Sequence, residues 1–263
     1  MAAAGGSHYS SEVNYDEAIM AQVDGIQKEI ADAQTLVSER EDLQSLLNEY
    51  SQDDHVYQAK ILSLSAQYSH VRRTRGDGNC FFRAFGFSYF EKLLTDEKEY
   101  QRFKDLAARS KDELVELNFP AFTIEDFHEV FMEVLDMMGN NATEDQLIQK
   151  FQDEGISNYL VVYLRLLTSA QLQRNAVFFE NFIEGERTVK EFCNQEVEPM
   201  GKESDHIHII GLTEALGVCI RVEYVDRTGD DVNHHDFPED GSTPIVHLLY
   251  RPGHYDVLYL ANQ

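Results

Sequence analysis

The length, composition and charge of the chain exclude several classes of protein. With 263 residues, of which 43% are hydrophobic, the chain can form one large packed domain and is too apolar to be disordered. Its 22 basic and 47 acidic residues give a formal net charge of -25. This charge repels nucleic acid and favours basic protein partners, although it also fits a surface that only keeps the protein in solution.

Targeting signals and disulfides are not expected. No stretch approaches the roughly 20 apolar residues of a membrane span, and the N-terminus lacks the basic and apolar regions of a secretory signal. Three cysteines, Cys80, Cys193 and Cys219, cannot all pair within the chain. We therefore expect free thiols and a cytoplasmic location, with a nuclear pool also compatible. No cysteine has a partner at zinc-ligand spacing, so we expect neither a metal nor a cofactor.

The N-terminal part of the chain predicts helices. Residues 1–14 are small and polar, and we expect them to be disordered. After them, apolar residues recur at helical spacing in three stripes. The stripes are Ile19, Val23, Ile26 and Ile30; Leu43, Leu46, Leu47 and Tyr50; and Tyr57, Ile61, Leu64 and Tyr68. We expect the last two stripes to pack on the main domain and the first to form a mobile arm. We divide the chain into a helical arm over 15–50 and a main domain over 51–263.

The middle of the chain predicts one tight turn followed by helices. Residues 75–80 contain two glycines, an Asp and an Asn, which is typical of a turn. A proline-free apolar run over 81–94 predicts a buried helix that begins near Cys80. Thr123 is expected to be an N-cap, with Asp126 completing a variant of the capping box. Residues 159–172 predict a core helix, although Arg165 interrupts its apolar run.

The last quarter of the chain predicts strands. A short helix over 206–216 is expected to end at Gly217. Apolar and β-branched runs predict strands over 218–225, 245–250 and 254–260, with a polar, acidic loop over 226–242. Helices followed by strands indicate an α+β domain.

Cys80 is the first candidate for chemistry. The unpaired N–H groups and the dipole at the start of a helix favour a thiolate, and the same N–H groups suit an oxyanion. Gly78 allows the backbone to approach a substrate carbonyl closely. From the turn alone, a small buried cysteine explains the pattern equally well. Cys193 and Cys219 lie in a helical stretch and an apolar strand, and we interpret both as core cysteines.

His254 and Asp256 form the second candidate. Residues two apart on a strand share a face, so Asp256 is expected to accept the Nδ1 proton of His254 and leave Nε2 free toward a thiol. The alternative is two polar residues on the solvent side of an edge strand. His206 and His208 are also two apart, but no further ligand completes a metal site.

Several motifs together resemble a known family. Residues 77–84, DGNCFFRA, resemble the cysteine box of the ovarian-tumour (OTU) deubiquitinases, and residues 253–256, GHYD, resemble their histidine box. Four further segments are similar to the otubains: TIEDF at 123–127, YLVVYLRLLTS at 159–169, VEPM at 197–200 and SDHIHII at 204–210. The resemblance extends from about Tyr15 to Tyr259, and the long helical lead before Cys80 is similar to the longer of the two otubain paralogues.

The resemblance implies a fold and a set of site residues. The fold would be papain-like, α+β, with a small twisted sheet between helical layers and an N-terminal helical extension. Cys80 would be the nucleophile, His254 the base and Asp256 the orienting acid. Backbone at Asp77, Gly78 and Cys80 would form the oxyanion hole. The family also suggests contacts with substrate through His206, Ile19, Val23 and Ile26, and with ubiquitin-conjugating (E2) enzymes through Thr123.

The function implied by the resemblance is deubiquitination. The chain would be a monomeric thiol isopeptidase that cleaves ubiquitin chains linked through lysine 48 of ubiquitin, and it would also block ubiquitin-charged E2 enzymes without cleavage. Neither nucleic acid nor membrane is an expected partner. Two alternatives stay open: a ubiquitin- and E2-binding inhibitor that uses no chemistry, and a papain-like peptidase or acyltransferase of another family.

Overall fold

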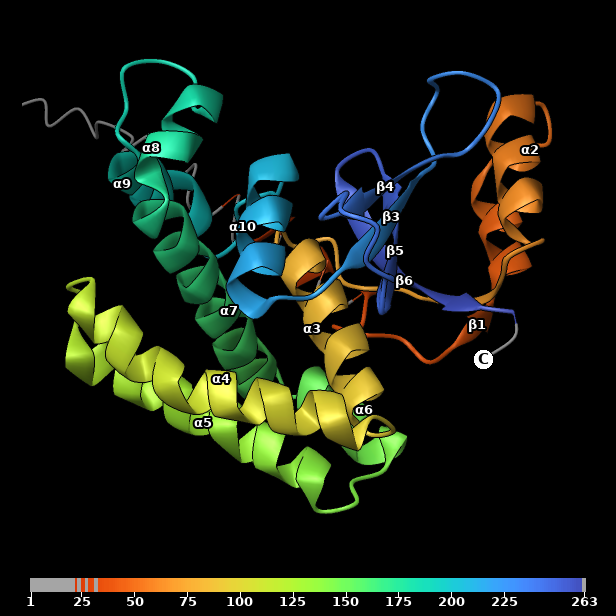
Figure 1. The fold of residues 1–263 in the computed structure, drawn as a ribbon. Helices are drawn as coiled ribbons and strands as arrows, with labels where there is room; N and C mark the ends of the chain where they lie inside the picture. The colour runs from red at the N-terminus through yellow and green to blue at the C-terminus, as the bar shows by residue number, and fades with distance from the viewer. Residues whose placement is uncertain (1–21, 23–24, 27, 31–32, 262–263) are drawn as a thin grey trace, which may run out of the picture.

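A single sheet lies between two helical layers of unequal size (Figure 1). The computed structural model describes residues 22, 25–26, 28–30 and 33–261. The helices in this part are η1 (Leu43–Glu49), α2 (His55–Leu64), α3 (Cys80–Leu93), α4 (Glu97–Glu116), α5 (Ala121–Gly139), α6 (Glu144–Gln152), α7 (Glu154–Arg174), α8 (Ala176–Phe179), η2 (Glu180–Phe182), α9 (Val189–Phe192), η3 (Cys193–Val197) and α10 (His206–Leu216). None of these described helices is long and apolar enough to cross a membrane.

The strand order puts the C-terminal strand inside the sheet. The strands are β1 (Glu41–Asp42), β2 (Tyr68–Arg72), β3 (Ile220–Tyr224), β4 (Asn233–Phe237), β5 (Val246–Arg251) and β6 (His254–Leu260). Their order is β1-β2-β6-β5-β3-β4, and only the β3–β5 pair is parallel. Because β6 pairs with both β2 and β5, His254 and Asp256 do not lie on an edge strand, which overturns the solvent-side alternative.

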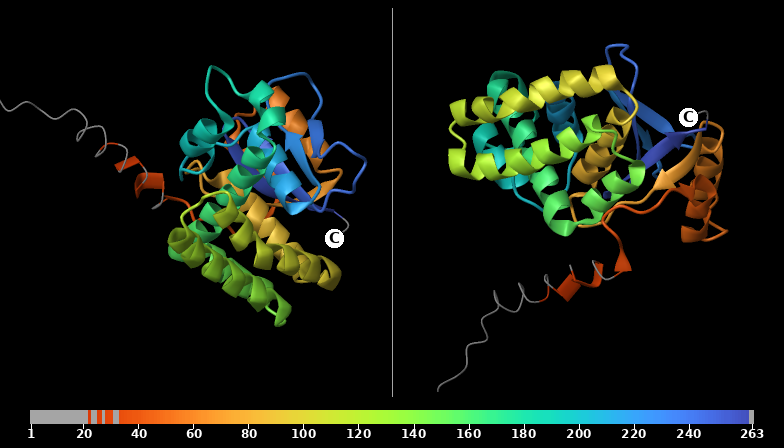
Figure 2. Two further views of the ribbon diagram at one scale, coloured as in Figure 1. Left: turned by 60° about the vertical axis from the view of Figure 1, so that its left-hand side comes forward. Right: turned by 90° about the horizontal axis from the view of Figure 1, so that it is seen from below.

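Alternation along the strands supplies apolar side chains to both faces of the sheet. Leu248 and Val257 join the larger core cluster, which includes most of α3. Their neighbours Leu249 and Leu258 join a smaller cluster with side chains of η1 and α2. The right-hand view of Figure 2 shows the sheet between α2 and the larger helical body. The sheet is thus covered on both faces, as predicted.

Helix α3 is the central helix and positions Cys80. Its Phe81, Phe82, Phe85, Phe87 and Phe90 side chains are all buried, so this helix is apolar around its whole circumference, as expected for a helix packed on every side. It contacts β5 and β6 on one side and α7 on another. A Cβ added to Gly86 would lie 3.1 Å from a methyl group of Leu164, which shows how closely α7 approaches α3.

Most predicted elements are confirmed. Residues 80–93, 154–174, 206–216 and 254–260 form α3, α7, α10 and β6, and Gly217 ends α10 with φ +63°. The stripe that includes Leu43 forms a short 3-10 helix rather than an α-helix.

Three local predictions are wrong. Tyr68 begins β2 instead of ending a helix, because α2 stops at Leu64 and the Tyr68 hydroxyl donates to Glu223 in the sheet. Thr123 lies inside the first turn of α5, whose N-cap is Pro120. The acidic loop contains β4, an edge strand whose polar, largely exposed side chains hide its strand character in the sequence.

Among the described residues that precede α2, some are packed in the core and others are exposed to solvent. Leu36 and Val37 are buried, and Val37 forms a bridge with Thr74. Leu43 and Leu46 are buried against α2. Ile26, in contrast, is 50% exposed. Ile19 and Val23 lie outside the described residues.

Candidate active site

Cys80 is the first residue of α3 and follows a tight loop. Asn79 is the N-cap, and the Cys80 side chain is only 5% exposed. The thiol therefore lies at the positive end of the helix dipole, next to backbone N–H groups that have no helical acceptor. This environment suits a thiolate nucleophile.

His254 and Asp256 lie together at the start of β6. The Nε2 atom of His254 is 2.8 Å from Oδ1 of Asp256, and the same ring interacts electrostatically with Cys80. Since Nε2 contacts Asp256, the nitrogen that faces the thiol is Nδ1. This reverses the predicted assignment of the two nitrogens. Alternate residues on a strand are about 7 Å apart. Because of this separation, the ring nitrogen farther from the backbone, Nε2, is the one that reaches Asp256.

Asp256 is fully buried and is contacted on both oxygens. Oδ1 also accepts a hydrogen bond from the Thr74 amide at 2.9 Å, and Oδ2 accepts one from Nη2 of Arg251 at 2.7 Å. Burial opposes ionisation, but the bonds and charges of His254 and Arg251 outweigh it and lower the pKa of Asp256. The carboxylate is therefore charged and fixed in orientation.

The electrostatics favour an imidazolium at His254. Burial lowers its pKa, but the hydrogen bonds with Asp256 and Cys80 and the charges of both residues act in the opposite direction and raise the pKa of His254 to about 10. A histidine with this pKa is protonated at neutral pH. The imidazolium can thus donate a proton to a leaving group.

The loop of residues 77–80, here called the oxyanion loop, directs carbonyls inward. The carbonyl of Asp77 accepts from Nδ2 of Asn79 at 3.4 Å, and the carbonyl of Asn79 accepts from the Arg83 amide at 3.0 Å. In a trans peptide the C=O and the following N–H point in opposite directions. The amides of Gly78 and Cys80 therefore point away from these donors, and neither donates a hydrogen bond to the part of the chain that the structure describes.

The Asp77 amide differs from the prediction. It donates to the carbonyl of Arg75 at 3.0 Å, so in this structure it is already occupied. The Asp77 side chain instead stabilises the loop, because its carboxylate accepts from the Asn79 amide and from Nη1 of Arg83, each at 2.9 Å. The free donors in the predicted oxyanion hole are thus Gly78 and Cys80.

A cleft of about 500 Å³ borders His254. It lies between the catalytic strand and the N-terminal segment, and its wall carries two carboxylates, Glu41 and Glu49, and two guanidinium groups, Arg73 and Arg251. Arg251 bonds Oε2 of Glu49 at 2.6 Å while it bonds Asp256. Glu49, which lies ahead of α2, is therefore linked to the catalytic carboxylate through Arg251.

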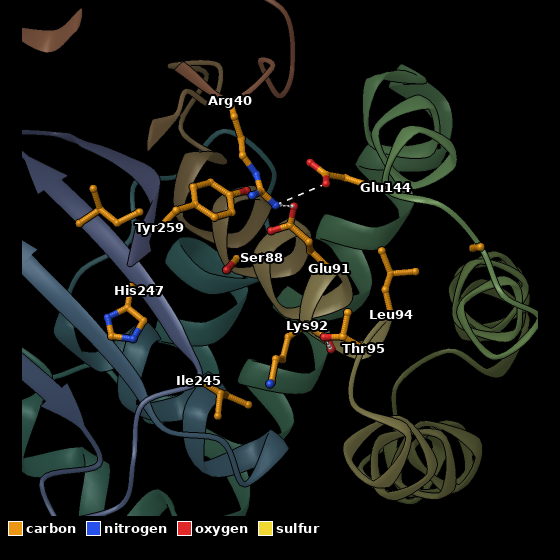
Figure 3. Close-up of a pocket in the computed structure, with 12 residues that line it drawn as sticks. Arg40, Ser88, Glu91, Lys92, Leu94, Thr95, Glu144, Ile245, His247 and Tyr259 are labelled. Carbon is orange, nitrogen blue, oxygen red and sulfur yellow. Dashed lines mark hydrogen bonds and ion pairs between the residues drawn. The ribbon is translucent and has the colours of Figure 1, made fainter. Parts of the chain in front are cut away.

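A second cavity, of about 580 Å³, lies elsewhere and contains neither Cys80 nor His254. Figure 3 shows Arg40 bound to Glu91 and Glu144 and lying over the ring of Tyr259. These charged groups are paired with one another. We find no arrangement here that resembles a nucleophile with a base.

The other predicted site residues lie apart from this arrangement. His206 stacks on Tyr224 at the start of α10. Thr123 is exposed on α5 next to Phe122, and Ile26 is half exposed. Burial raises the pKa of the Cys193 thiol to about 12 and also raises that of Cys219, so both thiols are poor nucleophiles. Among the described residues, no group of three or more His, Cys, Asp or Glu side chains could hold a metal.

Four supporting residues were not predicted from the sequence. Thr74 and Arg251 fix Asp256, Asn79 fixes the carbonyl of Asp77, and Arg165 contacts the same loop from α7. Only Arg165 carried a signal, as a charged residue in an apolar helix. The others are polar residues in turns, where polar side chains are expected for many reasons.

The chain matches an established family model and curated relatives. Residues 29–260 match the family described as Peptidase C65 Otubain. Over 246 residues, which cover 93% of this chain and 90% of the relative, the sequence is 61% identical to ubiquitin thioesterase OTUB1 of Homo sapiens. It is 40% identical to ubiquitin thioesterase OTUB2 of Homo sapiens over 228 residues, 87% of this chain and 97% of that relative.

Solved structures agree with these sequence matches. The fold superposes with a TM-score of 0.90 on a chain of the complex of h/ceOTUB1 with ubiquitin aldehyde and UBCH5B~Ub, at 40% identity, covering 94% of this chain and 98% of that one. A chain of the complex of ceOTUB1 with ubiquitin aldehyde and UBC13~Ub gives a TM-score of 0.86 at 36% identity, covering 91% and 98%.

Proposed function

We propose that this chain, which belongs to the otubain family of cysteine deubiquitinases, hydrolyses ubiquitin chains through a Cys80–His254–Asp256 triad. The family, the papain-like α+β fold and the cysteine deubiquitinase class predicted from the motifs are confirmed. The higher identity to OTUB1 than to OTUB2 agrees with the predicted similarity to the longer otubain.

One observation carries the proposed chemistry. The ring of His254 is hydrogen-bonded to the carboxylate of Asp256 and interacts electrostatically with the thiol of Cys80, beside two unoccupied backbone donors. In the proposed reaction, the Cys80 thiolate attacks the carbonyl carbon at the C-terminus of ubiquitin. The carbonyl oxygen becomes an oxyanion that the Gly78 and Cys80 amides stabilise.

His254 completes the proposed cycle. The imidazolium donates its Nδ1 proton to the leaving lysine amine, which breaks the isopeptide bond and leaves a thioester on Cys80. The neutral ring then accepts a proton from water, and the resulting hydroxide attacks the thioester. When the second intermediate collapses, ubiquitin leaves as a carboxylic acid and the thiolate–imidazolium pair is restored.

The proposal also includes the type of ubiquitin linkage that is cleaved and the role of the N-terminal arm. The leaving lysine needs an approach beside His254, and the cleft there is walled by the segment of residues 33–49. We propose that residues 15–34 extend this wall and contact the ubiquitin that carries the lysine, through Ile19, Val23 and Ile26. Such a contact would select ubiquitins joined through lysine 48.

Cleavage of a panel of di-ubiquitins tests the linkage. We expect hydrolysis of the form linked through lysine 48 of ubiquitin to exceed that of each other form by at least about tenfold. Cys80→Ala should cleave none of them. Equal rates on all linkages would contradict the proposed selectivity but leave the chemistry intact, whereas no cleavage of any form by the wild type would contradict the chemistry.

A second function, inhibition of ubiquitin-charged E2 enzymes, has separate support. Structures similar to this chain contain UBCH5B~Ub and UBC13~Ub. At the start of α5, Phe122 is 80% exposed beside Thr123, and Tyr159 of α7 is 40% exposed. Large exposed apolar side chains of this kind are typical of protein-binding surfaces.

Two variants separate inhibition from cleavage. Cys80→Ser should abolish cleavage and still inhibit ubiquitin transfer by an E2 enzyme. Phe122→Ser should do the reverse, and Leu62→Ser, at a 54% exposed leucine on α2, is the matched control that should change neither activity. Loss of inhibition in Cys80→Ser, or its retention in Phe122→Ser, would contradict a separate E2-binding surface.

A further inference from the structure

Arg165 is a buried charge that the proposed chemistry does not yet use. It lies on α7 in the middle of an apolar run, and its side chain is 0% exposed. No carboxylate of the described residues pairs with it. Burying an arginine without a counter-ion is costly. Burial accordingly lowers the pKa of Arg165 to about 10, at which the group is still charged at neutral pH.

The donors of Arg165 converge on two loops. Nη2 donates to the carbonyl of Gly78 at 3.0 Å, to Oδ1 of Asn79 at 3.0 Å and to the carbonyl of Lys202 at 2.7 Å. Nη1 donates to the carbonyl of Val197 at 3.0 Å. The guanidinium therefore joins the oxyanion loop to residues 198–204, here called the crossing loop, which runs beside it.

The crossing loop contacts the oxyanion loop directly as well. The Gly201 amide donates to the same Oδ1 atom of Asn79 at 2.9 Å, and a Cβ on Gly78 would lie 2.1 Å from the Gly201 carbonyl. Below the guanidinium, the ring of Phe82 lies 4.6 Å away in a cation–π contact. The position of Arg165 is thus fixed by backbone, amide and aromatic groups together.

These contacts set the direction of the peptide groups. The hydrogen bond from Arg165 holds the Gly78 carbonyl in one orientation, in which the carbonyl points toward the guanidinium. It also orients the Asn79 amide, whose Nδ2 then donates to the Asp77 carbonyl. Fixing the Asp77 carbonyl turns the Gly78 N–H in the opposite direction, away from the Asn79 side chain. Gly78 has φ +76° and lacks a Cβ, so its flanking peptides would otherwise rotate readily.

We propose that Arg165 is a positioning residue that locks the oxyanion loop with the Gly78 amide directed at the reacting carbonyl. The inference rests on the proposed function, since it concerns stabilisation of that reaction's oxyanion. An arginine is suited to this task because its planar fork donates to several acceptors at fixed angles, which a lysine ammonium does not reproduce.

The test compares two reactions of the same thiol. Hydrolysis of a fluorogenic ubiquitin C-terminal amide passes through an oxyanion, whereas alkylation of Cys80 by iodoacetamide displaces iodide and forms none. For Arg165→Lys we expect kcat to fall about 100-fold, as for loss of an oxyanion donor, with KM changed less than threefold and the alkylation rate within threefold of the wild type. Arg165→Met, which removes the charge as well, should show the same split between the two reactions.

Arg72→Lys is the matched control. Arg72 is also a fully buried arginine, but it bonds Tyr259 and Glu144 away from the site. It should lower the melting temperature without lowering kcat. If neither Arg165 variant folds, Asn79→Ala replaces them, because it removes the side-chain acceptor of Arg165 in the oxyanion loop and leaves the arginine in place, and it should give the same split.

The outcomes are separable from those for the proposed function. Absence of hydrolysis by the wild type would overturn the function itself. If the wild type hydrolyses the substrate, an unchanged kcat in Arg165→Lys would overturn the inference. Equal losses in hydrolysis and alkylation would also overturn it, because they would show that Arg165 acts on the thiol or on the fold rather than on the oxyanion donors.

Discussion

At the scale of residues, the sequence indicates which groups react but not how they are oriented. The glycine-rich turn before Cys80 and the two-residue spacing of His254 and Asp256 made these three residues candidates, and the family resemblance implied their catalytic roles. Spacing does not determine which imidazole nitrogen meets Asp256, and the structure places Nε2 there. It also does not reveal Arg251, whose contact with Asp256 depends on the turn between β5 and β6.

The charge of Asp256 is predicted to be essential for turnover. Asp256→Asn preserves the size of the side chain but removes the charge that stabilises the imidazolium, so we expect kcat to fall at least about 100-fold. The change also leaves Arg251 without its buried partner, which should lower the free energy of unfolding by roughly 3 kcal/mol. Steady-state kinetics and chemical denaturation measure the two effects, and an unchanged kcat would show that another group orients His254.

The pH profile is predicted to report the ion pair. Activity requires the imidazolium, and the pKa of His254 is raised to about 10, so the active form persists through neutral pH and is lost as pH rises through about 10. We therefore expect the profile of kcat/KM to fall along an alkaline limb near pH 10. A profile with no alkaline limb up to pH 11, recorded where the fold is intact, would argue against the pair.

At the scale of elements, the site depends on loops and on a segment distant in sequence. The crossing loop restricts the oxyanion loop at Gly78, and Glu49 of η1 bonds Arg251 behind the catalytic carboxylate. Apolar runs predicted α3 and α7, and a short apolar run that ends at Gly217 predicted α10, because each helix buries apolar residues over several turns. It did not predict β2 or β4, which are short, and β4 exposes polar side chains at the sheet edge.

Gly78 and Gly229 separate backbone strain from the contact between loops. Both have positive φ, +76° and +66°, but only at Gly78 would a Cβ meet other atoms. Alanine at Gly229 should lower the free energy of unfolding by about 1 kcal/mol and leave turnover unchanged. Gly78→Ala should lower it by more than about 3 kcal/mol and abolish cleavage. Similar effects at both sites would show that the loop contact is unimportant.

Truncations test where the N-terminal arm ends. Deletion of residues 1–34 should leave the melting temperature unchanged and sharply weaken chain cleavage and E2 inhibition. Deletion of residues 1–38 also removes Leu36 and Val37, both buried, and should lower the free energy of unfolding by roughly 3–6 kcal/mol, from about 1.5–3 kcal/mol for each side chain. A large drop in melting temperature with the shorter deletion would indicate that the arm is packed permanently on the domain.

At the scale of the whole molecule, the topology brings together residues that lie far apart in the sequence. Strand β6 pairs with β2, and the chain after β2 leads through the oxyanion loop into α3, so Cys80 meets His254. Helical stripes in the first part of the chain and β-branched runs in the last quarter predicted an α+β class, but they contained no information on strand order. The resemblance of residues 77–84 and 253–256 to the two boxes of one family implied that Cys80 and His254 lie together.

The central claim is that one thiol, Cys80, reacts with the C-terminus of ubiquitin. Ubiquitin carrying a thiol-reactive electrophile at its C-terminus tests this claim directly, with the adduct located by peptide mapping. We predict a single adduct on the peptide that contains Cys80, none on those that contain Cys193 or Cys219, and no adduct in Cys80→Ala. Labelling of either other cysteine, or labelling that persists in Cys80→Ala, would contradict the account.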